Sequence, residues 1–395
     1  MRSNLFGIIA LFILFVTSCK DGKESFYKYF DGEYVGSKNI QIKKIELEEI
    51  KLGSNEFCSF EGKVLVKDSN LIFIDERFCF AYVYDRNGKF ISTQLGQGRG
   101  PMELSAGRLE MASLFKDKYV FLGSGMDMHI HDSDWCRLST TVSNYNKKGR
   151  NQNNSKPEDM DPYNFHYGNM YARINSKNEM FIPIYAECKN FGIASGENYY
   201  LNGRILMKYN LDKGEYDGVF GRISPEYYKR LPNVLPYHMY YDFEIDRDDS
   251  FTISYEIDSL IYHYSKDFNL KYVFGNAGSD MDTTFQTVKL PIRKAINPDE
   301  LIASRSTKGY YSHIEYFEEY DLMFRSYTKG GEANVDGLQI YKGTSLIGDI
   351  DVPKGFNWVK GCIPPYFYSN VLLNDEEESM RIYRFELPKS ILKRI

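Results

Sequence analysis

Short apolar and aromatic runs alternate with polar turns along most of the chain. The clearest case is the segment 71–101, in which LIFID, AYVYD and FISTQL are separated by short polar stretches and followed by a glycine-rich corner. Apolar runs of this length, bounded by Gly, Asn and Asp, predict β-strands joined by tight turns. The pattern therefore favours an all-β protein.

The same strand–turn–strand design recurs along the chain. AYVYDRNGKFISTQLG, ILMKYNLDKGEYDGVFG and LIYHYSKDFNLKYVFG each contain an aromatic-rich strand, a polar turn and a second strand closed by Gly96, Gly221 or Gly275. Six such units, spaced by about 60 residues, predict the blades of a β-propeller over residues 38–395. Two stacked β-sandwich domains are the alternative, although no Pro- or Ser-rich linker divides the chain.

A propeller has to close its ring, since an open ring leaves an unpaired strand edge. The stretch Ile40–Leu52, IQIKKIELEEIKL, alternates apolar and charged residues. We expect it to supply the missing outer strand of the last blade. Insertions account for the length of the units: residues 144–162 predict a polar loop, and residues 278–308 contain FQTVKLPIRKAI and NPDELIASR, where we expect helices.

The first residues predict an export signal. Leu5–Val16 is an apolar run after Arg2, and it is short for a membrane span. The following Val-Thr-Ser-Cys resembles a bacterial lipobox. This resemblance implies a signal peptide over residues 1–18, lipidation of Cys19 and a lipid-anchored tether over residues 19–37. An ordinary signal peptide with an incidental Cys19 is the alternative.

Charge and cysteine content narrow the function classes. Lys and Arg number 49 against 54 Asp and Glu, a net charge of −5 without a basic block, so we expect no nucleic-acid partner. Removing Cys19 leaves five cysteines whose spacing suits no zinc motif. Cys58 and Cys79 are the one pair of cysteines that we consider for a disulfide.

The glycine-rich corner, Gly96-Gln-Gly-Arg-Gly-Pro-Met-Glu103, carries a family resemblance. It is similar to the Gly-x-Gly-x-Gly-Pro-x-Glu corner of six-bladed β-propeller lipoproteins of Bacteroidetes, a TolB-like or NHL-like group. The resemblance implies the propeller fold and an outer-membrane location in the cell envelope. It does not specify whether the protein is on the periplasmic or the external side of that membrane. If the corner leads into an inner strand, Gln97 and Arg99 lie near the ligand face.

The segments that lead into the predicted inner strands are rich in aromatic residues and histidine. The binding candidates among them are His166, Tyr167, His238, Tyr240, Tyr241, Tyr311, His313 and Trp358. Aromatic faces stack on sugar rings and apolar side chains, so we expect a binding face for a glycan or peptide, or a surface for an envelope protein. Packing between blades is the alternative interpretation of the same residues.

Catalytic and metal motifs are absent from the sequence. It contains no Gly-x-Ser-x-Gly, no His-Glu-x-x-His and no phosphate-binding loop. We expect no cofactor, with calcium on Glu56, Glu110 or Asp242 and a metal on the histidines as weaker alternatives. A binding protein is therefore the first hypothesis. A glycan hydrolase or lyase that uses carboxylates or histidines at the channel mouth is the alternative.

Overall fold

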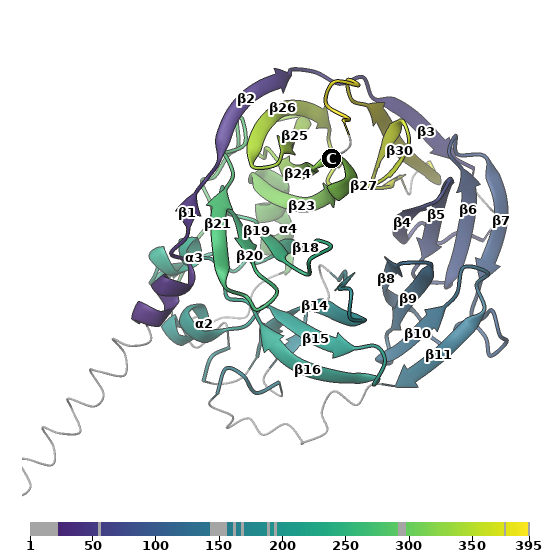
Figure 1. Cartoon of the computed structure of the whole chain (residues 1–395), viewed down its shortest axis with the longest axis horizontal. Coiled ribbons are helices and arrows are strands. Elements are labelled where there is room, and N and C mark those ends of the chain that lie inside the picture. Colours follow the sequence, from purple (N-terminus) through teal and green to yellow (C-terminus); the bar gives the residue numbers. More distant parts are fainter. Residues whose placement is uncertain are drawn as a thin grey trace, which may run out of the picture.

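Six small sheets surround a central axis, each turned edge-on to it, in the computed structural model (Figure 1). The fold is a six-bladed β-propeller, as predicted, and the sandwich alternative is wrong. The structure describes residues 23–53, 57–142, 156–160, 163–166, 170–187, 190–192, 196–290, 298–374 and 377–393.

The strands of each blade follow the chain outward from the axis, except that the inner strand of blade three has two short pieces, and so does the second strand of blade six, where β28 and β29 both pair with β30. Blades one and two consist of β4 (Gly62–Lys67), β5 (Asn70–Asp75), β6 (Phe80–Asp85) and β7 (Phe90–Leu95), then β8 (Leu109–Phe115), β9 (Lys118–Gly123), β10 (Asp127–His131) and β11 (Arg137–Val142). Blades three and four consist of β12 (Tyr163–Phe165), β13 (Arg173–Ile174), β14 (Glu179–Ala186), β15 (Leu206–Asn210) and β16 (Glu215–Phe220), then β18 (Tyr241–Ile245), β19 (Phe251–Tyr255), β20 (Ile261–Tyr264) and β21 (Leu270–Phe274). Blades five and six consist of β23 (Tyr310–Phe317), β24 (Leu322–Thr328), β25 (Val335–Lys342) and β26 (Ser345–Pro353), then β27 (Val359–Ile363), β28 (Tyr366–Ser369), β29 (Leu372–Asn374) and β30 (Ser379–Glu386).

An N-terminal strap runs along the outer edge of three blades (Figure 1, purple). Its strands β1 (Glu33–Tyr34) and β2 (Ser37–Ile42) pair in parallel with β21 and β26, and β3 (Glu48–Leu52) pairs antiparallel with β30. The predicted closure of the last blade is confirmed for β3. The prediction of one strand over Ile40–Leu52 is wrong, because its first residues belong to β2 on blade five.

The segment before the strap also packs on the propeller. Residues 23–29 are helical, and Phe26 is fully buried with its ring 5.3 Å from that of Tyr228. Phe30 lies edge-on to Tyr262 of blade four at 5.3 Å. The expected tether over residues 19–37 is thus attached to the propeller from residue 23 onward, because its aromatic residues bury against blade four. Cys19 lies outside the described residues.

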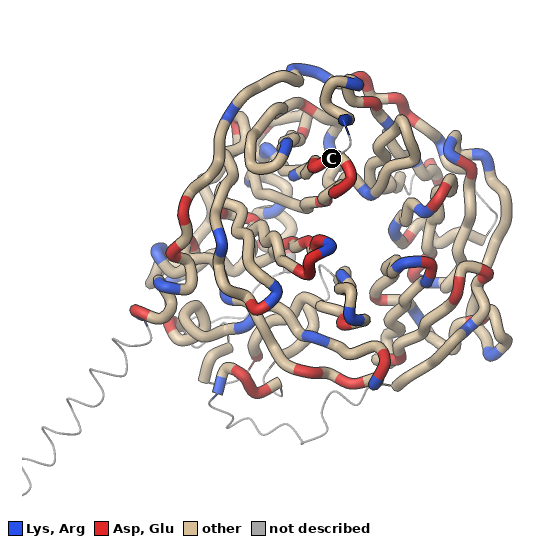
Figure 2. The backbone as a smooth tube through the Cα atoms, viewed as in Figure 1, with Lys and Arg blue, Asp and Glu red and all other residues tan. Residues whose placement is uncertain are grey.

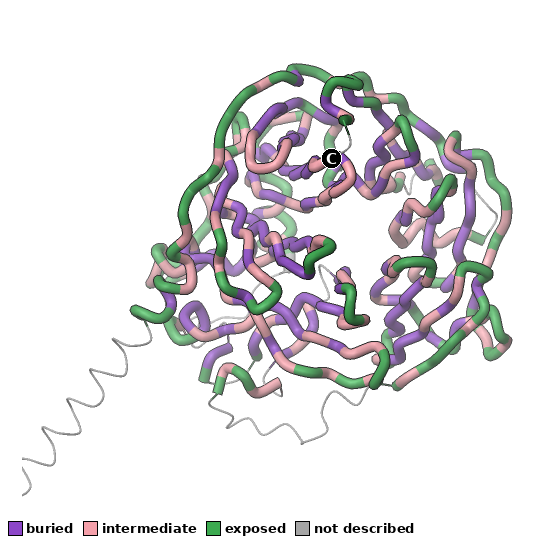
Figure 3. The backbone as a smooth tube through the Cα atoms, in the orientation of Figure 1, coloured by how far each residue is buried: buried purple, intermediate pink, exposed green. Residues whose placement is uncertain are grey.

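Aromatic side chains fill the spaces between neighbouring blades. Phe251 of blade four stacks on Phe268 at 4.3 Å and meets Phe181 of blade three edge-on at 4.8 Å. Buried positions concentrate in the inner parts of the blades, and the outermost strands are largely exposed (Figure 3). Burial of large aromatic surfaces between the sheets therefore holds the ring together.

The glycine-rich corner connects β7 to β8 and has a geometric explanation. The Glu103 carboxylate accepts a hydrogen bond from the Gly100 backbone N–H at 2.7 Å. A Cβ atom at Gly98 would lie 1.9 Å from Oε2 of Glu103. The motif thus pairs a glycine with a glutamate that folds back over it, and its first role is to shape the bend between two blades.

Among the described residues, three α-helices lie in connections between strands. They are α2 (Glu197–Asn202), α3 (Pro225–Lys229) and α4 (Pro298–Thr307). The helix predicted for NPDELIASR is confirmed by α4. The prediction of a helix for FQTVKLPIRKAI is wrong at Val288–Lys289. These two residues form strand β22, which pairs with β17 (Asn233–Val234). No helix within the described ranges has the length and apolar character needed to span a bilayer.

Candidate functional site

The inner strands of blades four, five and six carry polar side chains at alternate positions. These are Asp242 and Glu244 on β18, His313 and Glu315 on β23, and Trp358 and Lys360 at the start of β27. Residues two apart on a strand point to the same side, and here that side meets side chains of the neighbouring blades, as in the Asp242–His313 and Glu315–Trp358 contacts. Charged stretches accordingly surround the central opening (Figure 2).

Arg173 of β13 joins two of these strands. Its Nη2 atom contacts the Glu244 carboxylate and lies 3.0 Å from Oε2 of Glu315. The indole N–H of Trp358 donates to the same Glu315 oxygen at 2.7 Å. Burial opposes the charge on Arg173, but the two carboxylates outweigh it and raise the pKa of the guanidinium. The cluster ties blades three, four, five and six together across the channel.

Asp242 and His313 form a hydrogen-bonded pair beside this cluster. Oδ2 of the buried Asp242 lies 2.9 Å from Nδ1 of His313 and accepts the Ile314 backbone N–H at 3.0 Å. The imidazole stacks on Trp358 with the ring centroids 3.8 Å apart. Burial lowers the pKa of His313 despite the nearby carboxylate, so the ring is neutral near pH 7. Because Nδ1 is engaged with Asp242, the Nε2 edge is the one available to a ligand.

Two cavities open beside the pair, and both are lined by His313 and Asn357. The larger has a volume of about 510 Å³. Its other lining residues are Tyr240, Glu256, Arg305, Ser306, Tyr310, Ser312, Thr328, Asp336, Lys354 and Gly355. The smaller has a volume of about 350 Å³. Its other lining residues are Gly62, Lys63, Val64, Glu76, Met170, Trp358, Lys360, Asn370 and Val371.

Helix α4 supplies one wall of the larger cavity through Arg305. The guanidinium lies over the rings of Tyr240 and Tyr310, at 4.5 and 4.4 Å from their centroids. Its Nη2 atom lies 2.6 Å from Oε1 of Glu256. The predicted helix of the insertion thus brings to the cavity a cation that is paired with Glu256 and lies over Tyr240 and Tyr310.

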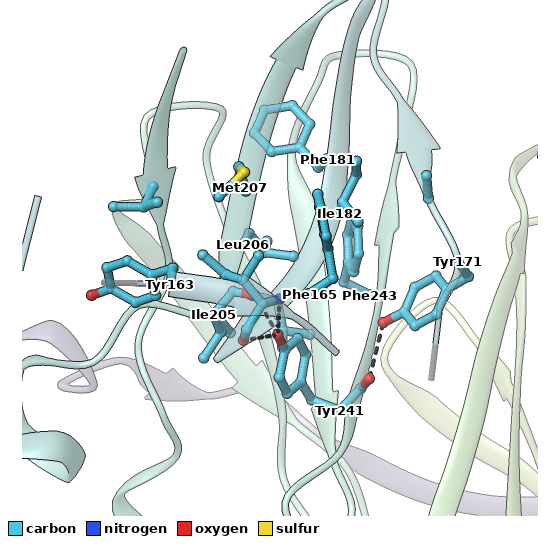
Figure 4. Packing of buried hydrophobic residues seen from close by; sticks show 14 of the residues in the cluster. Tyr163, Phe165, Tyr171, Phe181, Ile182, Ile205, Leu206, Met207, Tyr241 and Phe243 are labelled. Carbon is cyan, nitrogen blue, oxygen red and sulfur yellow. Dashed lines mark hydrogen bonds between the residues drawn. The ribbon is translucent and has the colours of Figure 1, made fainter. Parts of the chain in front are cut away.

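Three of the residues predicted for binding line these cavities: Tyr240, His313 and Trp358. Tyr241 lies behind them, where its hydroxyl donates to the carbonyl oxygens of Ile184, at 3.0 Å, and Ile205 (Figure 4). Its own carbonyl accepts from the hydroxyl of Tyr171 at 2.9 Å. In the structure Tyr241 is thus buried, with its hydroxyl engaged inside the protein.

The other predicted aromatic residues and histidines are also packed. The ring of His166 lies 4.4 Å from that of Tyr240, and Nε2 of His238 lies 3.1 Å from Oγ of Ser304. Burial lowers the pKa of both histidines to about 4. The Arg325 guanidinium lies 3.3 Å from the ring centroid of Tyr311. Of the three histidines, His313 lines the two cavities and the other two do not. Tyr167 lies outside the described residues.

Gln97 and Arg99 line neither cavity. The Gln97 amide donates to the carbonyl oxygens of Arg77, at 3.0 Å, and Gly107, at 2.8 Å. Arg99 is exposed, and its carbonyl accepts from Arg137 at 3.2 Å. These two hydrogen bonds give Gln97 a structural role, since they stabilise the conformation of the corner.

The residues considered for metal binding and for a disulfide do not form such sites among the described residues. Within the described ranges, no group of three or more His, Cys, Asp or Glu side chains is arranged to hold a metal ion. The oxygens of Asp242 accept N–H donors, with Oδ1 taking the Phe243 N–H at 2.7 Å. Glu56 lies outside the described residues. Cys58 and Cys79 are free thiols, so the disulfide left open between them is not formed.

Sequence reasoning missed Arg173, Glu244, Glu315 and Lys360. Each stands on a strand whose neighbouring positions are apolar or aromatic, which drew attention to packing. The available signal was the alternation itself, since Asp-x-Glu on β18 and His-x-Glu on β23 place charges on one side of buried strands. Such a side is costly to bury unless it faces a channel or a partner.

Comparisons with known proteins agree with the fold. No family model matches the chain, and no curated protein matches it. A solved structure of a member of the DUF4221 family from Bacteroides vulgatus is similar, with a TM-score of 0.59 and 12% identity over 87% of this chain and 98% of that one. A putative exported protein from Bacteroides fragilis is similar with a TM-score of 0.53 and 11% identity over 89% of this chain and 99% of that one. Identities this low establish a shared fold with these Bacteroides proteins and nothing further.

Proposed function

We propose that this protein is a lipid-anchored envelope protein that binds a saccharide at the mouth of its propeller channel. The observation that carries the proposal is the pair of adjoining cavities. The larger is lined by Ser306, Ser312, Thr328 and Asn357. The hydroxyls of Ser306 and Ser312 donate to the carbonyl oxygens of Ala303, at 3.0 Å, and Asn357, at 2.9 Å, so their oxygens are left as acceptors. The volume of this cavity lies within the range of ligand sites, and convergent hydroxyl and amide groups suit a ligand with many hydroxyls.

The mode of binding differs from the stacking expected at first. Trp358 is 6% exposed and covered by the imidazole of His313, so it offers no open face to a sugar ring. The rings of Tyr240 and Tyr310 have Arg305 over them. We therefore expect hydrogen bonds to provide most of the recognition, with the aromatic residues holding the walls in place.

Replacing Asn357 with Ala tests this proposal. Asn357 is exposed and lines both cavities. We expect about tenfold weaker binding of whichever saccharide a glycan array selects, since one hydrogen bond to the ligand is lost. Asn269→Ala is the matched control, because Asn269 is exposed in the turn between β20 and β21 and lines neither cavity. Selection of peptides but no saccharide by the wild-type protein would overturn the proposal in favour of a peptide ligand.

A second candidate function is supported by the Asp242–His313 pair. A neutral imidazole oriented by a buried carboxylate is the arrangement of a general base. It suits proton abstraction, as in a glycan lyase, better than hydrolysis by two carboxylates, since Asp242 already accepts three N–H groups. Chromatography of the selected saccharide after incubation decides between the two functions. Products that form with the wild type but not with His313→Gln would establish the enzyme.

The envelope location rests on the apolar run before Cys19. We expect Cys19→Ser to abolish incorporation of labelled palmitate in the producing bacterium and to move the protein from the membrane fraction to the soluble fraction. Ser18→Ala, which keeps a small residue before the cysteine, should leave both unchanged. Equal labelling of the Cys19→Ser variant would contradict lipidation at this position.

A further inference from the structure

Lys360 differs from the other half-buried cations beside the two cavities. Arg173 contacts two carboxylates, Arg305 contacts Glu256, and the ammonium of Lys63 lies 3.0 Å from Glu76. Among the described residues, Lys360 forms no ion pair. Its Nζ atom instead lies 3.3 Å from the ring centroid of Trp358. Lys360 is therefore a cation without an anionic partner in a partly buried site.

The carboxylates nearest to Lys360 are engaged elsewhere, which leaves its ammonium group available to an anionic ligand. Glu315 is engaged by both Arg173 and the Trp358 indole N–H. Asp242 is engaged by His313 and backbone N–H groups. The nearest carboxylates are thus already satisfied, and an unpaired ammonium in a partly buried site is costly. An anionic group that entered the smaller cavity would supply the missing partner.

The two cavities together specify where such a group would sit on the ligand. Lys360 lines the smaller cavity, and the hydroxyl-bearing wall belongs to the larger one. His313 and Asn357 belong to both, so a ligand that passes these residues enters both spaces. Resting on the proposed saccharide-binding function, we infer that the saccharide is acidic and that Lys360 binds its carboxylate in the smaller cavity.

The protonation of Lys360 gives this inference a pH signature. Burial lowers the pKa of the ammonium to about 8, against the opposing attraction of Glu315. The other titratable groups around it are Glu315 and His313 from β23, Arg173 from β13, Asp242 from β18, Lys63 from β4 and Glu76 after β5. His313 is already neutral at pH 7. A carboxylate binds the protonated amine, so affinity should fall as the pH rises through 8 and beyond, while a neutral ligand should show no such fall.

Titration calorimetry with a matched pair of saccharides tests the inference on the full chain. α-1,4-Linked trigalacturonate and galactotriose differ only in carrying a carboxylate or a hydroxymethyl group at C6. We expect at least tenfold tighter binding of the acidic probe at pH 7, loss of that preference in Lys360→Met, and its retention in Lys360→Arg. Lys266→Met is the control, since Lys266 is exposed in the turn between β20 and β21 and lines neither cavity. Thermal melting establishes that each variant is folded.

The outcomes separate the inference from the function on which it rests. Equal binding of the two saccharides, unaffected by Lys360→Met, would leave saccharide binding intact and overturn the inference. If neither saccharide binds but triglutamate binds in a Lys360-dependent manner, the carboxylate role of Lys360 stands and the saccharide is wrong. Failure of all three probes overturns the inference.

Discussion

Replacing Arg173 with Met is expected to lower the free energy of unfolding by about 3 kcal/mol, measured by urea denaturation at pH 7. Removing one partner of a buried ion pair leaves an uncompensated charge, and losses of about 3–5 kcal/mol are typical. Here two carboxylates, of Glu244 and Glu315, lose their common partner. The lower end of the range applies because the side chains are 10–20% exposed.

The loss should depend on pH with a defined sign. Burial raises the pKa of Glu244 already in the native protein, and removal of Arg173, whose charge lowers that pKa, would raise it further. A carboxyl group with a raised folded-state pKa stabilises the fold at low pH and loses that contribution as the pH rises. The difference between variant and wild type should therefore shrink toward pH 5.

Two further variants make the result specific to the cluster. Arg173→Met combined with Glu244→Gln and Glu315→Gln should recover more than half of the lost stability, because no uncompensated carboxylate remains. Arg247→Met is the control, since the Arg247 side chain is 74% exposed and its ion pair is with the surface residue Glu318. We expect its effect to be below about 1 kcal/mol. A similar loss in both single variants would contradict the role assigned to Arg173.

Much of the fold could be predicted because the information is local. A blade is built from strands that are neighbours in the chain, so polar turns and closing glycines such as Gly96 and Gly275 mark it directly. The alternation in Glu48–Leu52 likewise identified a strand with one buried side. The parallel pairing of β2 with β26 could not be found in this way, because Ser37 and Ser345 are neighbours only after the ring has formed.

The residues of the site show the same difference between local and long-range information. His313, Trp358 and Tyr240 could be found in the sequence because they lie at or near the beginning of inner strands, and inner strands line the channel. Arg173 was missed because the carboxylates that it contacts stand on other blades. Lys360 was missed because the charged groups around it, such as Glu315, also stand on other blades. The ring brings Arg173 beside Glu315 across 142 positions of sequence. Sequence spacing alone carries no trace of such a contact, although alternating charges on apolar strands indicate that one is needed.

Replacing Ile50 with Asp in the closing strand is expected to destabilise the protein by at least about 4 kcal/mol. Ile50 is 5% exposed and pairs with Ile382 of β30. Its methyl group also reaches the turn of blade one, where a Cβ atom on Gly88 would lie 2.5 Å from it. A carboxylate at this position would be buried between the first and last blades without a partner, which is among the most damaging kinds of substitution.

The effect should exceed a local loss because β3 links the two ends of the ring. Arg384 of β30 pairs with Glu48 of β3 and donates to Asn87 of blade one, and the Tyr84 hydroxyl of blade one donates to the Gly53 carbonyl after β3. Weakening β3 would expose the edge of β30 and separate both blades from their neighbours. Ile91→Asp is the matched control, since Ile91 on β7 is 54% exposed and should change stability by less than about 0.5 kcal/mol. Equal melting temperatures of the Ile50 and Ile91 variants would mean that the ring stays closed without β3, through the aromatic packing between its blades.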